Sequence, residues 1–320
     1  MQRYGMSIPF GGVPLHAHRE WICEVAELGY TDVWSSESDG ADGFTPLALS
    51  AAWAPSLRLG VAIIPAFTRA PAVMAQSAAA LARAAPGRFV MGLGASSNVI
   101  VERWNGVPFT HPYQRTRDMV RFLRAAFTGE KVSMACPSFT VDGFRLAIRP
   151  DPAPPILVAA LRQGMLTLAG REGDGAIINW LTAADVAKVA PLVHAAGPGK
   201  EIVCRIFVAP TTDREAVLEF GRRQIAAYLN VGVYAEFHRW LGRGEELAPM
   251  WEAWAAGDRK AALAAIPETL VDELIVNGTP DECRAHIQRY VDNGVTTPAL
   301  AVQPVRGLDL REAVRALAPA

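Results

Sequence analysis

The sequence predicts a (β/α)8 TIM barrel with insertions. Short apolar runs alternate with helical patterns along most of the chain, eight such runs can be counted, and no clear linker separates them. At 320 residues, of which 51% are hydrophobic, the chain has enough apolar surface for a large core. We expect one domain over residues 1–320, with insertions at about 129–149 and 231–270.

The eight expected strands are short, apolar and bordered by turn residues. They lie at 3–8, 31–34, 58–64, 88–93, 155–160, 175–178, 201–209 and 297–302. Helices are expected from about residue 15 and at 44–53, 71–84, 112–127, 163–170, 183–195 and 281–291. In the first helix, Trp21, Ile22 and Val25 fall on one stripe, and Gly29 stands where a left-handed C-terminal cap belongs.

The remaining segments have patterns of their own. Residues 129–149 contain SFTVDGF, which predicts a small hairpin around Asp142-Gly143. Residues 211–274 are helical by composition, and their aromatic side chains are expected to pack or to form a dimer surface. The helix at 112–127 is amphipathic, and its polar face is expected to be solvated; that face carries Arg115, Arg117, Arg121 and Arg124.

Composition narrows the possible partners. The formal net charge is −1 and no long Lys/Arg run occurs, so neither nucleic acid nor an anionic membrane is expected as a partner. Small-molecule partners are expected instead. The N-terminal stretch is too interrupted by Gly and Pro for a secretory signal, which favours a cytoplasmic location. The four cysteines are far apart, so no metal site or disulfide framework is predicted.

A turn of small residues, GLGASS at 92–97, follows the fourth expected strand. Glycines permit positive φ and close approach, and Ser96 and Ser97 add hydroxyl donors, so the turn suits a phosphate at the end of a strand. A plain strand-to-helix turn fits these residues equally well. A Rossmann fingerprint would need a third glycine at Ser97 and a place near the start of its domain. If phosphate binds here, Gly94→Val should abolish binding with little loss of stability.

In a barrel, the residues just past the strands converge on one face. This set is poor in nucleophiles and metal ligands, and it suits a planar cofactor better than hydrolysis. It comprises Ser7, Glu37, Ser38, Ile63, Ile64, Pro65, Gly94, Ala95, Ser96, Ser97, Ala159, Ala160, Arg162, Gln163, Asn179 and Trp180. Trp180 is a candidate for lining an apolar substrate pocket.

Three segments carry a family resemblance. They read DVWSSE at 32–37, VAIIPAFTRAPAVMAQSAAALARAAPGRFVMGLGASS at 61–97 and VAALRQGMLTLAGREGDGAI at 158–177. The chain resembles the bacterial-luciferase-like superfamily and, within it, the oxidoreductases that use the deazaflavin coenzyme F420. The likeness extends from the first strand to the end and is weakest between about 211 and 270.

The resemblance implies a site. A non-prolyl cis peptide among Val61, Ala62 and Ile63 would back the cofactor ring, Glu37 would lie near the ring, and the turns after the fourth and fifth strands would hold the phosphate. Together with residues at the strand ends, this gives the expected cofactor-binding set, which is Ser7, Glu37, Ala62, Ile63, Ile64, Gly94, Ala95, Ser96, Ser97, Ala159, Ala160, Arg162, Gln163, Gly164 and Asn179.

The implied reaction is hydride transfer between F420 and a small organic substrate, and a homodimer is implied as well. In sugar-phosphate dehydrogenase members of the family, a catalytic His and a catalytic Glu stand where this chain has Ser38 and Ser97. This departure argues against sugar-phosphate oxidation. Glu37 and Ser38 are the candidate catalytic residues, and the proton donor is unassigned. An FMN-dependent monooxygenase and a flavin- or deazaflavin-binding protein without turnover are the alternatives.

Overall fold

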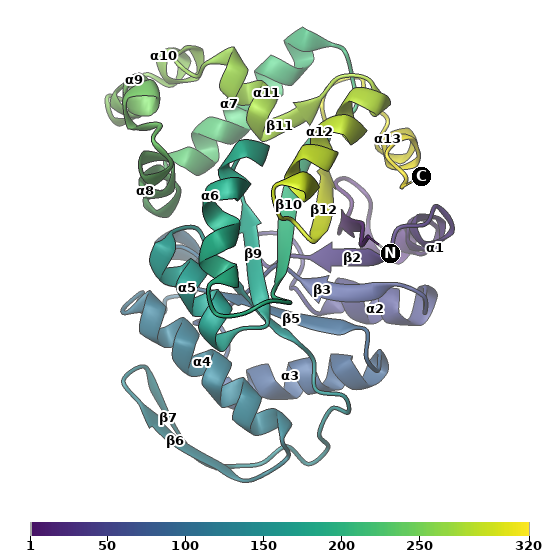
Figure 1. The fold of residues 1–320 in the computed structure, drawn as a ribbon, viewed down its shortest axis with the longest axis vertical. Coiled ribbons are helices and arrows are strands. Elements are labelled where there is room, and N and C mark those ends of the chain that lie inside the picture. Colours follow the sequence, from purple (N-terminus) through teal and green to yellow (C-terminus); the bar gives the residue numbers. More distant parts are fainter. Residues whose placement is uncertain (1, 320) are drawn as a thin grey trace.

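The computed structural model describes residues 2–319, in which eight parallel strands close into a barrel (Figure 1). Around the ring the strands are β1 (Gly5–Ser7), β2 (Asp32–Ser35), β3 (Arg58–Val61), β5 (Phe89–Gly94), β8 (Ile156–Ala159), β9 (Gly175–Asn179), β10 (Glu201–Ala209) and β12 (Thr297–Val302). β12 pairs with β1 and closes the ring. The predicted TIM barrel and its eight strands are confirmed.

Helices cover the outside of the ring (Figure 1). They are α1 (His18–Glu27), α2 (Thr45–Trp53), α3 (Pro71–Ala84), α4 (Pro112–Phe127), α5 (Gln163–Glu172), α6 (Ala183–His194), α12 (Pro280–Asp292) and α13 (Leu310–Ala316), with a short 3-10 turn, η1 (Leu15–Ala17), before α1. Gly29 has a φ of +88°, as its predicted capping role requires. No helix within residues 2–319 is long and apolar enough to cross a membrane.

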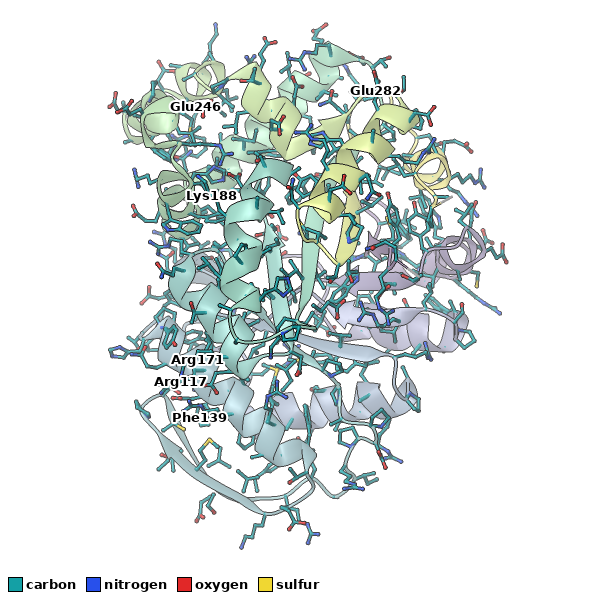
Figure 2. The ribbon with its side chains drawn as sticks, viewed as in Figure 1. Arg117, Phe139, Arg171, Lys188, Glu246 and Glu282 are labelled. Carbon is teal, nitrogen blue, oxygen red and sulfur yellow. The ribbon has the colours of Figure 1, made fainter. Side chains whose placement is uncertain are left out.

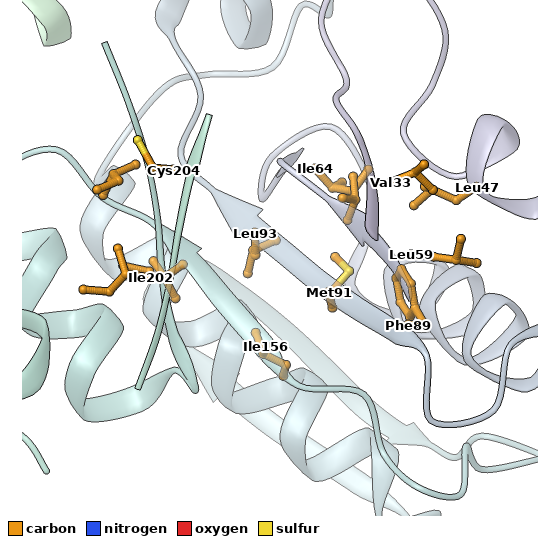
Figure 3. Close-up of a cluster of buried hydrophobic side chains, with 14 of the residues drawn as sticks. Val33, Leu47, Leu59, Ile64, Phe89, Met91, Leu93, Ile156, Ile202 and Cys204 are labelled. Carbon is orange, nitrogen blue, oxygen red and sulfur yellow. The ribbon is translucent and has the colours of Figure 1, made fainter. Parts of the chain in front are cut away.

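Side chains of the strands alternate between the helical layer and the barrel interior. Figure 3 shows part of the outer layer, where Leu59, Phe89 and Met91 are buried beneath the helices. A smaller inner cluster contains Trp34, and its indole fills the interior because Gly60 has no side chain. A Cβ at Gly60 would lie 2.2 Å from the Trp34 ring.

The hairpin predicted in 129–149 exists, but its turn is elsewhere. It consists of β6 (Val132–Cys136) and β7 (Phe139–Phe144), so the chain reverses at residues 137–138 and not at Asp142-Gly143. Gly143 has a φ of +67° within β7, near a shift in strand register. Its N–H donates to Ser133 Oγ, which in turn donates to Asp142 (2.9 Å each). The Asp-Gly pair therefore forms a bulge.

The arginines of α4 are not all solvated. Arg115 is half-buried, and its guanidinium donates to the carbonyls of Ala66 (2.8 Å) and Ser138 (2.9 Å). It also lies 5.0 Å from the ring of Phe139, which Figure 2 labels on the hairpin. The expectation of a fully solvated polar face is wrong at Arg115, because the hairpin covers that end of the helix.

The predicted helical stretch at 211–274 is confirmed and lies beside one end of the barrel (Figure 1). It contains α7 (Arg214–Leu229), α8 (Gly232–Leu241), α9 (Gly244–Ala255), α10 (Arg259–Ala264) and α11 (Glu268–Leu274), and it leads into β11 (Ile275–Asn277), which pairs with the end of β10. Lys188 of α6 donates to the carbonyl of Leu241 (2.9 Å) and so ties α8 to the barrel wall (Figure 2).

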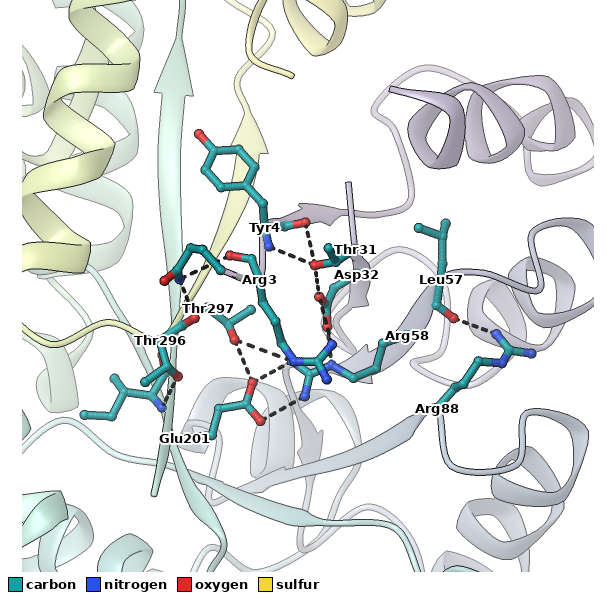
Figure 4. Close-up of polar contacts among 12 residues, drawn as sticks. Arg3, Tyr4, Thr31, Asp32, Leu57, Arg58, Arg88, Glu201, Thr296 and Thr297 are labelled. Atoms are coloured by element: carbon teal, nitrogen blue, oxygen red, sulfur yellow. Dashed lines mark hydrogen bonds and ion pairs between the residues drawn. The ribbon is translucent and has the colours of Figure 1, made fainter. Parts of the chain in front are cut away.

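A polar network closes the N-terminal end of the strands (Figure 4). Arg58 of β3 donates from Nε to Asp32 of β2 and from both Nη atoms to Glu201 of β10 (2.5 and 2.9 Å). Glu201 also accepts from the Thr297 hydroxyl (2.7 Å). Because these residues belong to four different strands, the network joins opposite sides of the ring.

Candidate functional site

A hollow opens within the ring toward the C-terminal ends of the strands. Its wall is apolar apart from three serines and one guanidinium, and it is lined by Ser7, Trp34, Ser35, Ser36, Ala62, Ile177, Val203, Arg205 and Ala299. Ser7 and Ala62 belong to the predicted cofactor set. The enclosed space is about 10 Å³, room for about one water, so a planar ring or the body of a substrate would lie at its opening and not inside it.

Between β3 and the short strand β4 (Ile64–Pro65), the peptide bond from Ala62 to Ile63 is cis. The expected non-prolyl cis peptide is therefore confirmed. The N–H of Ala62 donates to the Ser35 carbonyl (2.6 Å), and the Ile63 carbonyl accepts from the Glu37 N–H (3.3 Å). Ala62 and Ile63 are half-buried at the mouth, whereas Ile64 is completely buried and faces the core.

Glu37, the predicted acid near the ring, is already engaged. Its carboxylate accepts two hydrogen bonds from Arg69 Nη1 (2.5 and 2.6 Å), one from the Gly43 N–H (3.1 Å) and one from the Thr68 hydroxyl (3.4 Å). These donors come from the two loops that follow β2 and β4. In this arrangement Glu37 orders both loops and is not an unengaged acid.

Ser38, the other catalytic candidate, is exposed. Its hydroxyl donates to the neighbouring Asp39 carboxylate (2.9 Å), and Ser38 is not among the residues that line the hollow. The adjacent Ser36 does line it. The structure therefore brings Ser36, which the sequence reasoning passed over, closer to the barrel centre than the predicted Ser38.

The C-terminal ends of β5 and β8, called their exits below, lie side by side. A Cβ on Gly94, the last residue of β5, would lie 2.7 Å from the Ala159 Cβ and 3.0 Å from Ile63 Cδ1. This places the predicted phosphate turn beside both the end of β8 and the cis peptide. It also corrects the expectation for Gly94→Val: added methyl groups would crowd Ala159 and Ile63, so the substitution should lower stability too.

The turn after β5 does not use its glycines for positive φ. That conformation belongs to Ser96, whose φ is +66°. Gly92 is required for close approach instead, because a Cβ there would lie 1.7 Å from the Val61 carbonyl oxygen. Ala95, Ser96 and Ser97 are half-buried, and Ser97 accepts from the Val101 N–H (2.9 Å) at the start of a π-helix, η2 (Val99–Trp104).

Helix α5, which follows β8, begins without a side-chain cap. Its N-cap residue is Arg162, and no side chain accepts from the first turn. Arg162, Gln163 and Gly164 are exposed, and a Cβ on Gly164 would meet no atom within 4 Å. Ala160 is buried, and its N–H donates a hydrogen bond to the Ile177 carbonyl (3.0 Å). The open N–H groups and the positive end of the helix dipole make this start of α5 a ready anion site.

On the other side of the mouth, Asn179 ends β9, and its Nδ2 donates to the Tyr234 hydroxyl of α8 (3.4 Å). In the strand ladder Asn179 pairs with Arg205 of β10, which the sequence analysis did not select. The signal for Arg205 was available as the single cation within the apolar run IVCRIFVA. Tyr234 lies on an insertion helix, and nothing in the sequence links it to the mouth.

Trp180 packs in the core and does not line the hollow. Its ring is 2% exposed and lies 4.2 Å from that of Phe207 and 4.6 Å from that of Tyr228. Its φ is +53°, and its carbonyl accepts from His238 Nε2 (2.9 Å). Burial, together with the nearby Arg243 charge, lowers the pKa of His238 to about 4, so the imidazole is neutral when it makes this bond.

Comparison with known proteins agrees with this architecture. The 5,10-methylenetetrahydromethanopterin reductase of Methanolobus tindarius is 27% identical over 300 residues, which cover 90% of each chain. The solved structure of the coenzyme F420 dependent tetrahydromethanopterin reductase from Methanopyrus kandleri has a TM-score of 0.82 at 19% identity, covering 99% of this chain and 97% of that one. An F420-dependent secondary alcohol dehydrogenase, solved with an F420–acetone adduct, has a TM-score of 0.78 at 18% identity and 99% coverage of both chains.

A sequence model of the luciferase-like monooxygenase family matches residues 3–297, which is nearly the whole chain. The match includes every strand of the ring up to the start of β12, the cis peptide and both exits described above. The protein therefore belongs to the luciferase-like monooxygenase family.

Proposed function

We propose that the protein is an F420-dependent oxidoreductase that transfers a hydride between the deazaflavin and a small organic substrate. The observation that carries the proposal is the juxtaposition of the β5 and β8 exits, with the open start of α5, beside the Ala62–Ile63 cis peptide. The names of the similar F420-dependent reductase and F420-dependent alcohol dehydrogenase support the choice of F420, and they agree with the expectation from sequence.

The donors fit an anionic tail. The first-turn N–H groups of α5 and the serines after β5 would hold the phosphate. Arg162, which forms an exposed 3.9 Å ion pair with Glu236, adds a positive charge that would have to turn from Glu236 to the phosphate. Ala62 and Ile63 would support the ring next to the hollow. When bound, the deazaflavin supplies the two-electron hydride chemistry.

The protein would contribute orientation and a dry wall. The bonds from Arg69 to Glu37 fix the loops on either side of the cis peptide, and Trp34, Ile177 and Val203 keep water from the inner face of the hollow. We propose that Glu37 acts by positioning these loops. A catalytic role for Ser38 remains a prediction, and unchanged turnover in Ser38→Ala would contradict it.

Titration with F420 tests the cofactor. We expect the fluorescence and absorbance of the deazaflavin to change on binding at micromolar concentration, and absence of binding in that range would contradict the proposal. FMN is the second candidate, because the family is described as luciferase-like monooxygenases. Tighter binding of FMN than of F420, with oxygen-dependent turnover, would favour a monooxygenase. Tight F420 binding without any substrate-linked redox change would favour a binding protein.

A homodimer, a single domain and a cytoplasmic location remain predictions. Light scattering coupled to gel filtration tests the first, and a single cooperative unfolding transition tests the second.

A further inference from the structure

Arg205 stands in the middle of β10 and faces the hollow inside the barrel. Its strand neighbours are Asn179 of β9 and Ala299 of β12, and Ala299 lines the hollow together with Arg205. The residue is half-buried, and its Nε is shielded from solvent. The buried Nε is cut off from water, whereas the side chain as a whole keeps part of its surface exposed.

No group within residues 2–319 neutralises this cation. Nε has no hydrogen-bond partner, and the guanidinium forms no ion pair in that part of the chain. Its closest aromatic contact is the ring of Phe207, at 5.2 Å. A buried N–H without a partner costs free energy, and proteins usually avoid it. A ligand that supplies acceptors to this guanidinium would satisfy the buried Nε.

A second donor is linked to Arg205 through its strand neighbour Asn179. The Tyr234 hydroxyl accepts a hydrogen bond from Asn179 Nδ2 (3.4 Å), which leaves its own proton available for another acceptor. Burial raises the pKa of Tyr234, although Asn179 and the Arg205 charge oppose the shift, so the phenol stays protonated. The guanidinium lines the hollow and the phenol O–H is bonded to its strand neighbour Asn179, so the two groups offer donors to the oxygens of one small anion.

The position separates this site from the cofactor's phosphate. The uncapped start of α5 follows β8, the cis peptide follows β3, and Arg205 lies on β10. The hollow between them is lined by Ala62 on one side and Arg205 on the other. A ring resting on Ala62 would therefore turn its free face toward Arg205, which is where a substrate has to lie to exchange a hydride.

We propose that Arg205 and Tyr234 bind a carboxylate of the substrate, so that the enzyme acts on small organic acids. The inference rests on the proposed function, because it takes the hollow as the substrate side of the cofactor. It is consistent with the rest of the wall, where Ser7 and Ser36 are neutral and no acidic side chain lines the hollow.

Binding of matched probes tests the proposal. Acetate, crotonate and benzoate would each be compared with its neutral amide by calorimetry, both with F420 bound and without it. We expect at least one acid to bind the native chain about tenfold more tightly than its amide. Arg205→Gln should abolish that preference, Arg205→Lys should retain part of it, and Tyr234→Phe should weaken it less than Arg205→Gln. Arg149→Gln, at an exposed site, is the matched control.

Three results would overturn the proposal. These are equal binding of every acid and its amide to the native chain, a preference for acids that survives in Arg205→Gln, or loss of F420 affinity in that variant by the same factor, which would make Arg205 a cofactor residue. Thermal unfolding checks that the Gln and Lys variants are folded. If F420 does not bind but cofactor-free protein shows the Arg205-dependent preference, the carboxylate site stands and the proposed function fails.

Discussion

Two arginines inside one barrel differ in almost every contact. Arg58, at the N-terminal end of the strands, is bonded to Asp32 and Glu201 (Figure 4), whereas Arg205, toward the C-terminal end, has a buried Nε without a partner. Carboxylates of the chain balance the charge of Arg58, whereas Arg205 has no such partner in the described residues and is available to a ligand. The difference agrees with the general division of such barrels into a stabilising end and a functional end.

The starts of neighbouring helices show the same contrast. Thr182 and Asp185 form a reciprocal capping box at α6, and Thr279 and Glu282 form another at α12. Helix α5 has Arg162 in the capping position and no side-chain acceptor. The chain satisfies the donors of α6 and α12 internally and leaves those of α5 open, as it does at α1, α3 and α4. The exposed residues at its start and its place directly after β8 are what make α5 the proposed phosphate site.

Removing the paired arginine should have the largest effect. Arg58→Met would leave Glu201 without its ion-pair partner and Asp32 with only the exposed Arg3, 3.6 Å away, and breaking a buried pair in this way costs about 3–5 kcal/mol. Denaturant unfolding at neutral pH measures the loss, with Arg149→Met as the exposed control. A loss below about 1 kcal/mol would mean that the network does not hold the barrel closed.

A side-chain cap added to α5, like the one that α6 has, should lower the affinity for F420 and raise the stability of the helix. In Arg162→Asp, the new carboxylate would cap the first turn and repel a phosphate. We expect F420 affinity to fall by about 30-fold or more, while helix stability rises by about 1 kcal/mol. Arg162→Asn, which caps without the charge, should lose less affinity. Unchanged F420 binding in the Asp variant would place the phosphate elsewhere.

The unpaired arginine should respond in the opposite direction to the paired one. Arg205→Met removes a half-buried charge that has no partner, so the free energy of unfolding should rise by about 1 kcal/mol rather than fall. The same denaturant measurement applies. If stability drops as it does in Arg58→Met, Arg205 has structural partners and the contrast between the two ends disappears.

The smallest effect is expected in the response to acid. Burial alone would raise the pKa of Glu201, but its bonds to Arg58 and Thr297 outweigh burial, so the pKa lies below its usual range. A lowered folded-state pKa adds stability above the ordinary glutamate range, which is lost as pH falls through the folded-state value. The stability advantage of the native chain over Glu201→Gln should therefore shrink between about pH 5 and pH 3. A stability difference between the two proteins that stays constant over this pH range would contradict a lowered pKa of Glu201.

Local patterns were sufficient to predict the fold. Apolar runs of strand length and helical periodicity located all eight ring strands, and α3 and α4 begin and end where the sequence indicates. The failures came from contacts between distant segments. Asp142-Gly143 has the composition of a hairpin turn, but it forms a bulge because pairing with Ser133 decides its conformation.

The candidate site could be predicted only in part. The cis peptide, which the resemblance implies, and the turn after β5, which the residues indicate, are local features and lie where they were expected. Phosphate binding at that turn stays a prediction. The sequence analysis missed Arg205, because a single cation within a strand does not show which face of the strand its side chain occupies. The sequence also does not show whether a carboxylate lies beside it. Glu37 was recognised as an acid after a strand, but its bonds to Arg69 depend on a loop 32 residues away.

The most direct measurement compares the affinity of the protein for F420 with its affinity for the same deazaflavin chromophore lacking the phosphate tail. The account predicts that the native chain binds intact F420 about tenfold or more tightly, and that Arg162→Asp reduces this advantage. Equal affinity for both compounds in the native chain would contradict the claim that the open start of α5 and the turn after β5 hold the cofactor's phosphate.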